Sequence, residues 1–346
     1  MAVMRGARLE LTRDEILAFR RSVQALDERL PPGPASLRRA AWAGLQDSMP
    51  RAALLSIHAR VEGTRPTTWE DRSLVQLWGP RYSAYVVAKR DIAVFTLGRL
   101  LDDAEGLQRA VDLAARLDTL LAGLRVRHED AARPLHLRHP NYLRYAAPSG
   151  RVLIRWDGAR QPLVWTVRAP RVDPGEAGLE LARRYLHVFG PASPSSFAQW
   201  AGISPARASA AFDALARALV PVRTPVGEAS ILASDEAAFR VPIHPPAPAR
   251  LLPSGDSYFL LQGTDRALLV CDAKRRSALW TSRVWPGAIL ADGEVVATWR
   301  RAHRYVTIAP WKRLSRAQRA AIDAEAASLP LPDVAGDIAV RWAEAS

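Results

Sequence analysis

Three polar residues in a row, Gln46, Asp47 and Ser48, lie just before Pro50. Proline disfavours the α conformation at the residue before it and lacks a backbone N–H, so we expect the chain here to be extended or turned. In an extended chain alternate side chains share a face, which would aim the Gln46 amide and the Ser48 hydroxyl at one point and turn Asp47 away. Because a hydroxyl is a poor base, this pair offers hydrogen bonds that orient a water molecule.

Two predicted helices, at residues 36–45 and 50–61, flank this segment and must position it. Asp47 or Ser48 would also suit the N-cap of the second helix, and that role is compatible with chemistry. Asp47 would supply a carboxylate to the site only if the loop turned by one residue. The alternative for Gln46 is a buried amide whose hydrogen bonds are satisfied by the protein. These three residues are the candidate catalytic residues of the chain.

The composition predicts a globular protein with a polyanionic partner. The chain has 346 residues, enough for two to four modules, and 49% of them are hydrophobic. Its formal net charge is +13 and its pI is about 10.8. Such a balance favours nucleic acid over a membrane surface as the partner. The alternative is a high-GC genome that raises the Arg and Ala content.

Cysteine and histidine usage predicts neither a disulfide nor a metal site. The single cysteine, Cys271, excludes an intramolecular disulfide, and its apolar neighbours predict a buried, inert thiol. The seven histidines lack a His-Glu-x-x-His spacing, so we expect no metal and no cofactor. No apolar run is long enough to cross a bilayer, and residues 1–10 are too charged for a signal peptide. We expect a monomeric, cytoplasmic, nucleoid-associated protein.

The first 170 residues predict helices followed by a basic hairpin. Thr12 and Glu15 form a capping-box pattern that opens the first helix. Further predicted elements are helices at 69–78, 91–100 and 106–124, a strand at 81–87, and a hairpin at 150–158 and 163–167. Helices with a following hairpin are the outline of a winged helix; the alternative is a basic α+β domain.

Residues 171–246 predict a second winged helix. A predicted helix at 176–189 ends before Gly190 and Pro191. Ser-Pro pairs at 193–194 and 204–205 begin two more helices, and Gly202 lies in the short turn between them. This tight turn is helix-turn-helix spacing, and residues 220–232 predict the hairpin after it. Arg207 on the third helix and Arg223 on the hairpin are predicted to bind DNA, largely through phosphates. The alternative is a solvated structural helix, because the third helix is mostly alanine.

Residues 247–346 predict a small antiparallel β-barrel followed by a helix at 315–329. The short apolar runs at 258–261, 267–270, 288–290 and 295–299 are separated by turns. Between residues 250 and 319 there are thirteen Lys or Arg residues and five Asp or Glu residues. Basic clusters near tryptophans suit a surface that follows a nucleic-acid backbone, although a solvated basic face is the alternative. The residues concerned are Lys274, Arg275, Arg276, Arg300, Arg301 and Arg304.

The segment 44–50, with the Ala/Leu/Arg-rich helix after it, resembles the catalytic segment of the AlkZ/YcaQ-type winged-helix DNA glycosylases. That family has Gln-x-Gln or Gln-x-Asp before the proline, whereas this chain has Gln46, Asp47 and Ser48. The segment from Arg72 to Arg81 is also similar, with Tyr85 where a histidine is usual. The chain is also similar to this family at Leu251–Pro253, at Asp265-Arg266 and at residues 292–300. The resemblance implies an α+β fold of tandem winged helices and a barrel around a DNA-binding cleft that includes Arg72 and Arg81.

The resemblance implies hydrolysis of the N-glycosidic bond of alkylated purines, including bulky and crosslinked adducts. Gln46 would then hold the attacking water through its amide oxygen, and Ser48 would at most help to orient it. The alternative hypothesis is a non-catalytic DNA-binding protein, a lesion sensor or regulator, which the Gln-Asp-Ser departure motivates. In either case the expected partner is double-stranded DNA.

Overall fold

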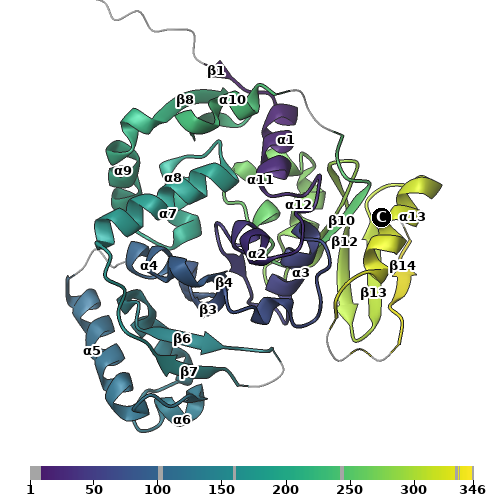
Figure 1. Cartoon of the computed structure of the whole chain (residues 1–346). Coiled ribbons are helices and arrows are strands. Elements are labelled where there is room, and N and C mark those ends of the chain that lie inside the picture. Colours follow the sequence, from purple (N-terminus) through teal and green to yellow (C-terminus); the bar gives the residue numbers. More distant parts are fainter. Residues whose placement is uncertain are drawn as a thin grey trace, which may run out of the picture.

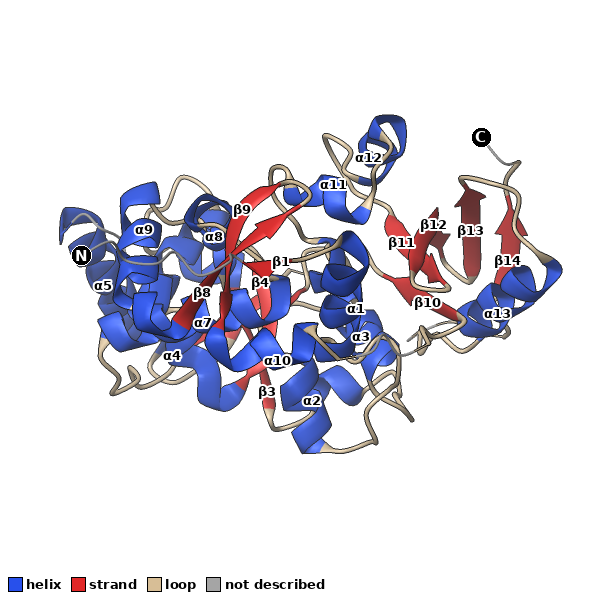
Figure 2. Cartoon of the chain, turned by 90° about the horizontal axis from the view of Figure 1, so that it is seen from above, coloured by secondary structure: helices blue, strands red, loops and turns tan. Residues whose placement is uncertain are grey.

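The fold is a mixed α+β arrangement with three separate sheets (Figure 1). The computed structural model describes residues 9–99, 104–158, 161–241, 245–331, 334 and 336–344. Seen from above, the C-terminal sheet lies at one end of the molecule and the helices of the middle region at the other (Figure 2).

The first region is built on a six-stranded sheet in the order β2-β4-β3-β6-β7-β5, with every pair antiparallel. The strands are β2 (Leu45–Gln46), β3 (Leu74–Trp78), β4 (Ala84–Ala88), β5 (Val126–Arg127), β6 (Val152–Arg155) and β7 (Leu163–Thr166). The helices are α2 (Pro34–Ala40), α3 (Ala52–Arg60), α4 (Ile92–Phe95), α5 (Ala104–Leu121) and α6 (His128–Ala132). The expected hairpin is present as β6 and β7, within this larger sheet.

The helix predicted at residues 69–78 is wrong, because Leu74–Trp78 forms strand β3. This strand lies between β4 and β6, and Leu74, Leu77 and Trp78 are all buried there. Their spacing of three and four residues imitates one face of a helix, whereas a central strand can bury both of its faces. The helix expected at 91–100 is also broken: α4 ends at Phe95, a 3-10 turn occupies Leu97–Arg99, and residue 100 lies outside the described residues.

The middle region has the expected order of three helices and a hairpin. They are α7 (Pro174–Phe189), α8 (Pro194–Ala201), α9 (Pro205–Ala214), β8 (Leu219–Thr224) and β9 (Gly227–Leu232). The hydroxyls of Ser193 and Ser204 cap α8 and α9, and Gly202 ends α8 with a φ of 70°. The third helix, which the sequence predicts to run from Pro205 to Leu219, ends earlier, because α9 stops at Ala214 and a 3-10 turn leads into β8.

The start of the chain packs against this middle region. Strand β1 (Leu9–Glu10) pairs in parallel with β8, and Phe19 of α1 (Arg13–Val23) stacks on Phe239 of α10 (Glu236–Phe239). The capping box predicted at Thr12 and Glu15 is confirmed.

The C-terminal region holds an open five-stranded sheet. Its order is β10 (Ala249–Leu252), β11 (Gly287–Ala291), β12 (Glu294–Ala302), β13 (Tyr305–Pro310) and β14 (Ala339–Trp342). The predicted antiparallel barrel is not observed: among the described residues no sheet closes, and the pair β13–β14 is parallel. Helix α13 (Arg316–Ala327) packs against the edge strands β10 and β14 and so supplies the apolar cover that closure would have provided.

Two apolar runs predicted as strands in this region are helical. Residues Ser257–Phe259 form a 3-10 turn and Asp265–Leu269 form α11, which is followed by α12 (Ala273–Leu279). The prediction of a buried Cys271 is also wrong, because this thiol is exposed. It lies in the turn between α11 and α12, beside the Asp272 side chain that caps α12.

Candidate active site

Gln46 and Ser48 lie outward of a buried Asp47, as the predicted extended chain requires. Leu45 and Gln46 form β2, paired with Val86 and Tyr85 of β4. Gln46 is half-buried and Ser48 is exposed, whereas Asp47 is 2% exposed. The alternation of side chains along the strand therefore decides which of the three polar groups solvent can reach.

The amide of Gln46 is held from two sides. Its Oε1 accepts a hydrogen bond from Nη2 of Arg81 at 3.0 Å, and the Tyr85 hydroxyl lies 3.5 Å from the same oxygen. On the other side a Cβ at Gly255 would lie 3.2 Å from Nε2 of Gln46, so the missing side chain leaves room for the amide. Since the guanidinium can only donate, it fixes the amide with its oxygen toward Arg81.

Arg81 joins this amide to the helix-turn-helix of the middle region. Its Nη1 donates to the Trp200 carbonyl in α8 at 2.9 Å. Its backbone adopts a left-handed φ of 54°, and a Cβ at Gly202 would lie only 3.1 Å from the Arg81 backbone. The turn after α8 therefore packs directly on the residue that orients Gln46.

Asp47 anchors the loop to its surroundings. Its Oδ1 accepts from the Ala53 N–H of α3 at 3.0 Å, and its Oδ2 accepts from Nε2 of Gln76 at 2.7 Å. Burial raises the pKa of this carboxyl to about 6, although the hydrogen bonds from Ala53 and Gln76 oppose that shift. Oε1 of Gln76 in turn accepts from the Trp156 N–H at the end of β6. The expectation that Asp47 or Ser48 is the N-cap of α3 is wrong, because that position is Arg51, whose side chain makes no capping hydrogen bond; Asp47 instead satisfies the Ala53 N–H from four residues before Arg51.

A buried ion pair holds the segment that carries Gly255. Arg60 of α3 donates from Nη1 and Nη2 to the two carboxylate oxygens of Asp256, at 2.7 Å each. Both side chains are about 1% exposed, and Ser56 adds a hydrogen bond of 2.6 Å to Asp256. Helix α3 therefore contacts two parts of the site: the loop, through the hydrogen bond from Ala53 to Asp47, and the segment of Gly255, through Arg60 and Asp256.

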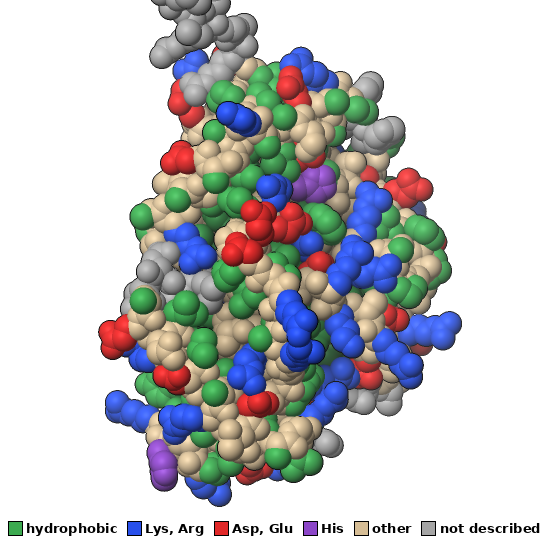
Figure 3. All heavy atoms as spheres, turned by 60° about the vertical axis from the view of Figure 1, so that its left-hand side comes forward, with side chains coloured by type: hydrophobic (Ala, Val, Ile, Leu, Met, Phe, Trp, Pro, Cys, Tyr) green, Lys and Arg blue, Asp and Glu red, His purple; other side chains and the backbone are tan. Residues whose placement is uncertain are grey.

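The residues predicted to bind DNA are spread over several elements. On the face shown in Figure 3, Lys and Arg side chains are numerous and gather along the right-hand side. Arg72, Lys274, Arg300 and Arg304 are exposed, as is Arg223, which pairs with Glu10 at 3.8 Å. The half-buried ones are Arg81, Arg207, Arg275, Arg276 and Arg301. Arg81 contacts Gln46 directly, and Arg300 and Arg301 line a cavity together with Met49 and Pro50, so the fold brings these three to the predicted catalytic loop.

A family model described as "DNA glycosylase AlkZ-like" matches residues 37–330 of this chain. The chain belongs to the AlkZ-like DNA glycosylase family. The solved structure of the Streptomyces sahachiroi DNA glycosylase AlkZ is similar, with a TM-score of 0.76 and 18% sequence identity, over 97% of this chain and 100% of that one. At that identity the likeness shows the fold. No curated protein matches the chain.

Several residues around the candidate site come from segments that the sequence does not single out. Gly255 and Gln76 carry no motif, and only the folded chain brings them to the loop. Arg51 and Arg155 both lie over the Trp69 ring, with guanidinium carbons 4.5 and 3.9 Å from the ring centre. Tyr85 did have a signal in the sequence, because the resemblance places a histidine at that position.

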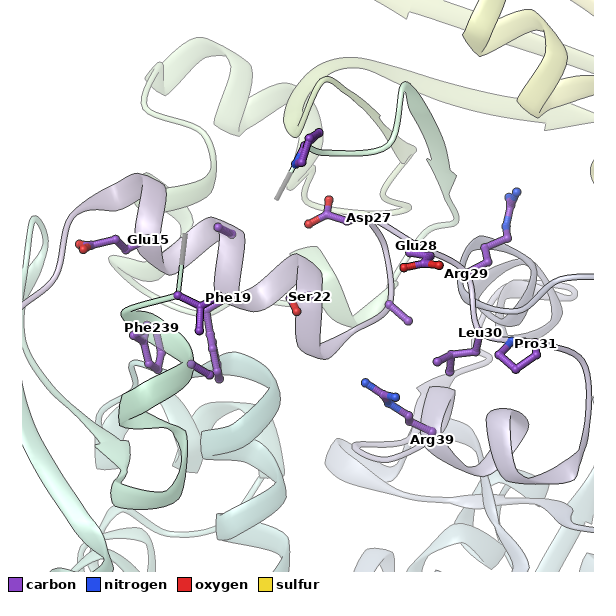
Figure 4. A pocket seen from close by; sticks show the side chains of 15 residues that line it. Glu15, Phe19, Ser22, Asp27, Glu28, Arg29, Leu30, Pro31, Arg39 and Phe239 are labelled. Atoms are coloured by element: carbon purple, nitrogen blue, oxygen red, sulfur yellow. The ribbon is translucent and has the colours of Figure 1, made fainter. Parts of the chain in front are cut away.

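A second cavity, of about 700 Å³, lies between α1, the loop that follows it and α10 (Figure 4). Its lining includes the carboxylates of Asp27 and Glu28 and the guanidinium of Arg39. The described residues that line it include none of those predicted for catalysis or DNA binding. Across the described part of the chain, no group of three or more His, Cys, Asp and Glu side chains is arranged to hold a metal. Nor does any helix there have the length and apolar character needed to span a membrane.

Proposed function

We propose that this chain hydrolyses the N-glycosidic bond of alkylated purines in double-stranded DNA, with N7 or N3 adducts, bulky and crosslinked ones included, as substrates. Family membership supports the general activity. The observation that carries the specific proposal is the half-buried Gln46 amide, whose oxygen is fixed by Arg81. The reaction as proposed uses neither a metal nor a cofactor.

The chemistry requires little more than a positioned water. Alkylation at N7 leaves the base cationic, so it departs without much help from a general acid. The sugar then develops oxocarbenium character, and water must attack it. The Oε1 atom of Gln46 has two lone pairs, and Arg81 uses one of them. The other faces the Tyr85 hydroxyl at 3.5 Å, and in this proposal the water displaces that long contact and donates to Oε1. The water then points its own lone pair at the sugar and loses its proton to solvent as the bond to the sugar carbon forms.

The neighbouring residues have distinct parts in this proposal. The exposed Ser48 hydroxyl adds a second hydrogen bond to the water. Asp47 acts through the loop, because its two carboxylate oxygens already hold α3 and Gln76. The exposed arginines and Lys274 bind phosphates, which positions the duplex without reading its sequence. Extruding a bulky lesion from the duplex is costly, so in this proposal the labile base reacts while it is only partly extruded.

Single-turnover base release tests the proposal. A duplex with one N7-methylguanine is incubated with excess protein, and abasic sites are counted after alkaline cleavage. We expect Gln46→Ala to lower the rate constant by about 100-fold, the lower range for a positioned catalytic group. Gln108→Ala, an exposed glutamine on α5, is the matched control. Equal release by wild type and Gln46→Ala would refute the role of Gln46.

A non-catalytic lesion sensor is the second candidate function. It is favoured by one observation: the only carboxylate of the segment 46–50, Asp47, is buried, so the loop offers solvent no strong base. This candidate predicts DNA affinity that falls steeply with salt, since phosphate contacts release counterions. It also predicts no base release above that of protein-free DNA. Protein-dependent abasic sites would exclude it.

A further inference from the structure

A cavity of about 260 Å³ opens beside the predicted catalytic loop. Met49 and Pro50 form one wall, and Pro253 and Ser254 form another. Gln46 lies just before the first wall in sequence, and the residue that follows the second, Gly255, contacts the Gln46 amide. Two segments of the cavity lining therefore lead directly to the candidate catalytic group.

The third wall is aromatic and rigidly held. Trp299 of β12 is 4% exposed and donates its Nε1–H to the Leu252 carbonyl at 2.8 Å. A Cβ at Gly287 would overlap the Trp299 indole, so only glycine admits the ring in this position. Trp285 lines the same cavity and is partly buried against the central core. Flat, preformed apolar walls of this kind suit a planar ligand, and the volume is just below the roughly 300 Å³ at which small-molecule sites begin.

The charges around the cavity select among ligands. Arg300 is exposed and bonds the Val284 carbonyl at 2.9 Å, and Arg301 is half-buried; both line the cavity. A cationic purine would be repelled by two guanidinium groups. An uncharged substituent carried by that purine would avoid this repulsion and pack on the apolar walls, while the neighbouring phosphates would face the arginines.

We propose that this cavity binds the flat, uncharged, aromatic substituent of an alkylated purine and so selects which lesions the protein holds. The inference rests on the proposed function, because it takes alkylated DNA as the substrate. The aromatic substituent stacks against the tryptophan walls, and the purine remains outside, next to Gln46. A methyl adduct is too small to reach those walls.

Affinity for two lesions tests this inference without requiring turnover. Duplexes carry N7-methylguanine or N7-benzylguanine on a 2′-fluorinated sugar, because the fluorine disfavours the oxocarbenium ion and keeps the base attached. Dissociation constants are measured by fluorescence anisotropy. For the wild type we expect the benzyl duplex to bind at least tenfold more tightly than the methyl duplex, in line with aromatic stacking energies.

Four variants separate the cavity from general effects. Ser254→Phe fills the cavity and is expected to reduce the benzyl-to-methyl ratio to about one. Trp285→Ala is expected to lower the ratio, and Trp285→Phe to restore most of it, which a folding defect would not do. Thr119→Phe adds an exposed aromatic ring on α5 as the matched control and keeps the wild-type ratio.

The outcomes for the cavity and for the proposed function are distinct. A wild-type ratio near one, or a ratio that survives Ser254→Phe, overturns the cavity assignment. Base release is measured separately on duplexes without the fluorine. Absence of release together with an intact ratio refutes the glycosylase function and leaves the cavity as the lesion site of a sensor.

Discussion

At the scale of single residues, the contact between Arg81 and Gln46 has the clearest chemical consequence. A guanidinium that donates to an amide oxygen turns that oxygen into a fixed acceptor, and Gln46 then needs no reorganisation when water binds. The same contact occupies one lone pair, so the amide holds at most a single water, in place of the long contact from the Tyr85 hydroxyl. A site with one fixed acceptor orients a nucleophile but cannot take its proton.

The orientation of Gln46 predicts a defined effect of Arg81→Met. Loss of the charged hydrogen bond frees the amide to rotate, and we expect the single-turnover rate constant for base release to fall about tenfold, as befits roughly 1.5 kcal/mol. The measurement is made at saturating protein, so weaker DNA binding does not contribute. Arg90→Met, an exposed arginine, serves as the control. An unchanged rate constant would mean that Arg81 acts only on DNA binding.

A buried histidine makes stability depend on pH. Burial lowers the pKa of His58 to about 3, and the positive charges of Arg29 and Arg250 add to that shift. An unfolded histidine titrates near 6.5, so below this pH the unfolded chain binds the extra proton and stability falls. Asp47 has the opposite sign, because its raised pKa favours the folded chain as pH falls through about 6.

We expect the His58 contribution to the free energy of unfolding to fall by roughly 2 kcal/mol between pH 7.5 and pH 5, at about 1.4 kcal/mol per pH unit. Urea unfolding at the two pH values measures the change. His58→Gln keeps a polar partner for Ser328 but does not titrate. The change in unfolding free energy between pH 7.5 and pH 5 should differ by that amount between the variant and the wild type. An identical pH dependence of the two proteins would contradict the assignment.

Local chemistry predicted part of the site and could not predict the rest. The alternation along an extended chain correctly placed Gln46 and Ser48 outward and Asp47 inward, because that rule depends only on neighbouring residues. Arg81 and Gly255 surround Gln46 from distant segments. Their roles come from the packing of the Gly202 turn and the Arg60–Asp256 pair, neither of which has a sequence signal near residue 46.

At the scale of elements, the start of a helix could be predicted from the sequence where capping residues mark it. Ser193 and Ser204, each followed by proline, correctly predicted where α8 and α9 begin, because both devices act within one turn of the chain. Strand β3 was predicted as a helix, and the apolar run in α11 was predicted as a strand. Short apolar runs satisfy either period, and their neighbours in the tertiary structure decide between them.

The turn after α8 predicts different effects for two glycine substitutions. Gly202→Ala places a methyl group against the Arg81 backbone and also strains a left-handed residue. Gly123→Ala has the same kind of strain, at a φ of 85°, with no described atom within 4 Å of the new methyl group. We expect both variants to lose about 1–2 kcal/mol of stability in urea unfolding.

Only Gly202→Ala should also slow base release, by several-fold, because it displaces Arg81. The rate is compared at a temperature where both variants are fully folded by circular dichroism. If Gly123→Ala slows release to the same extent, the effect belongs to stability alone and not to the contact between the turn and Arg81.

At the scale of the whole molecule, the buried pair of Arg60 and Asp256 ties the first region to the C-terminal one. Removing one partner leaves an unpaired charge in the core, and we expect Asp256→Ala to cost about 3–5 kcal/mol of unfolding free energy. The double variant Arg60→Met/Asp256→Leu removes both charges. It should recover a large part of that loss in chemical denaturation, and recovery of none would show that the pair is favourable in its own right.

Helix α3 has no solvent face: all nine of its residues are buried. Leu55 packs into the core of the C-terminal sheet, Ala59 into the central core, and Leu54 into the core of the first region. A substitution in this helix disturbs the packing of at least one of these three cores, so the helix tolerates few mutations. Natural variation in lesion preference would therefore accumulate in the exposed residues 48–50 that precede α3, where the chain can diversify without risking its fold.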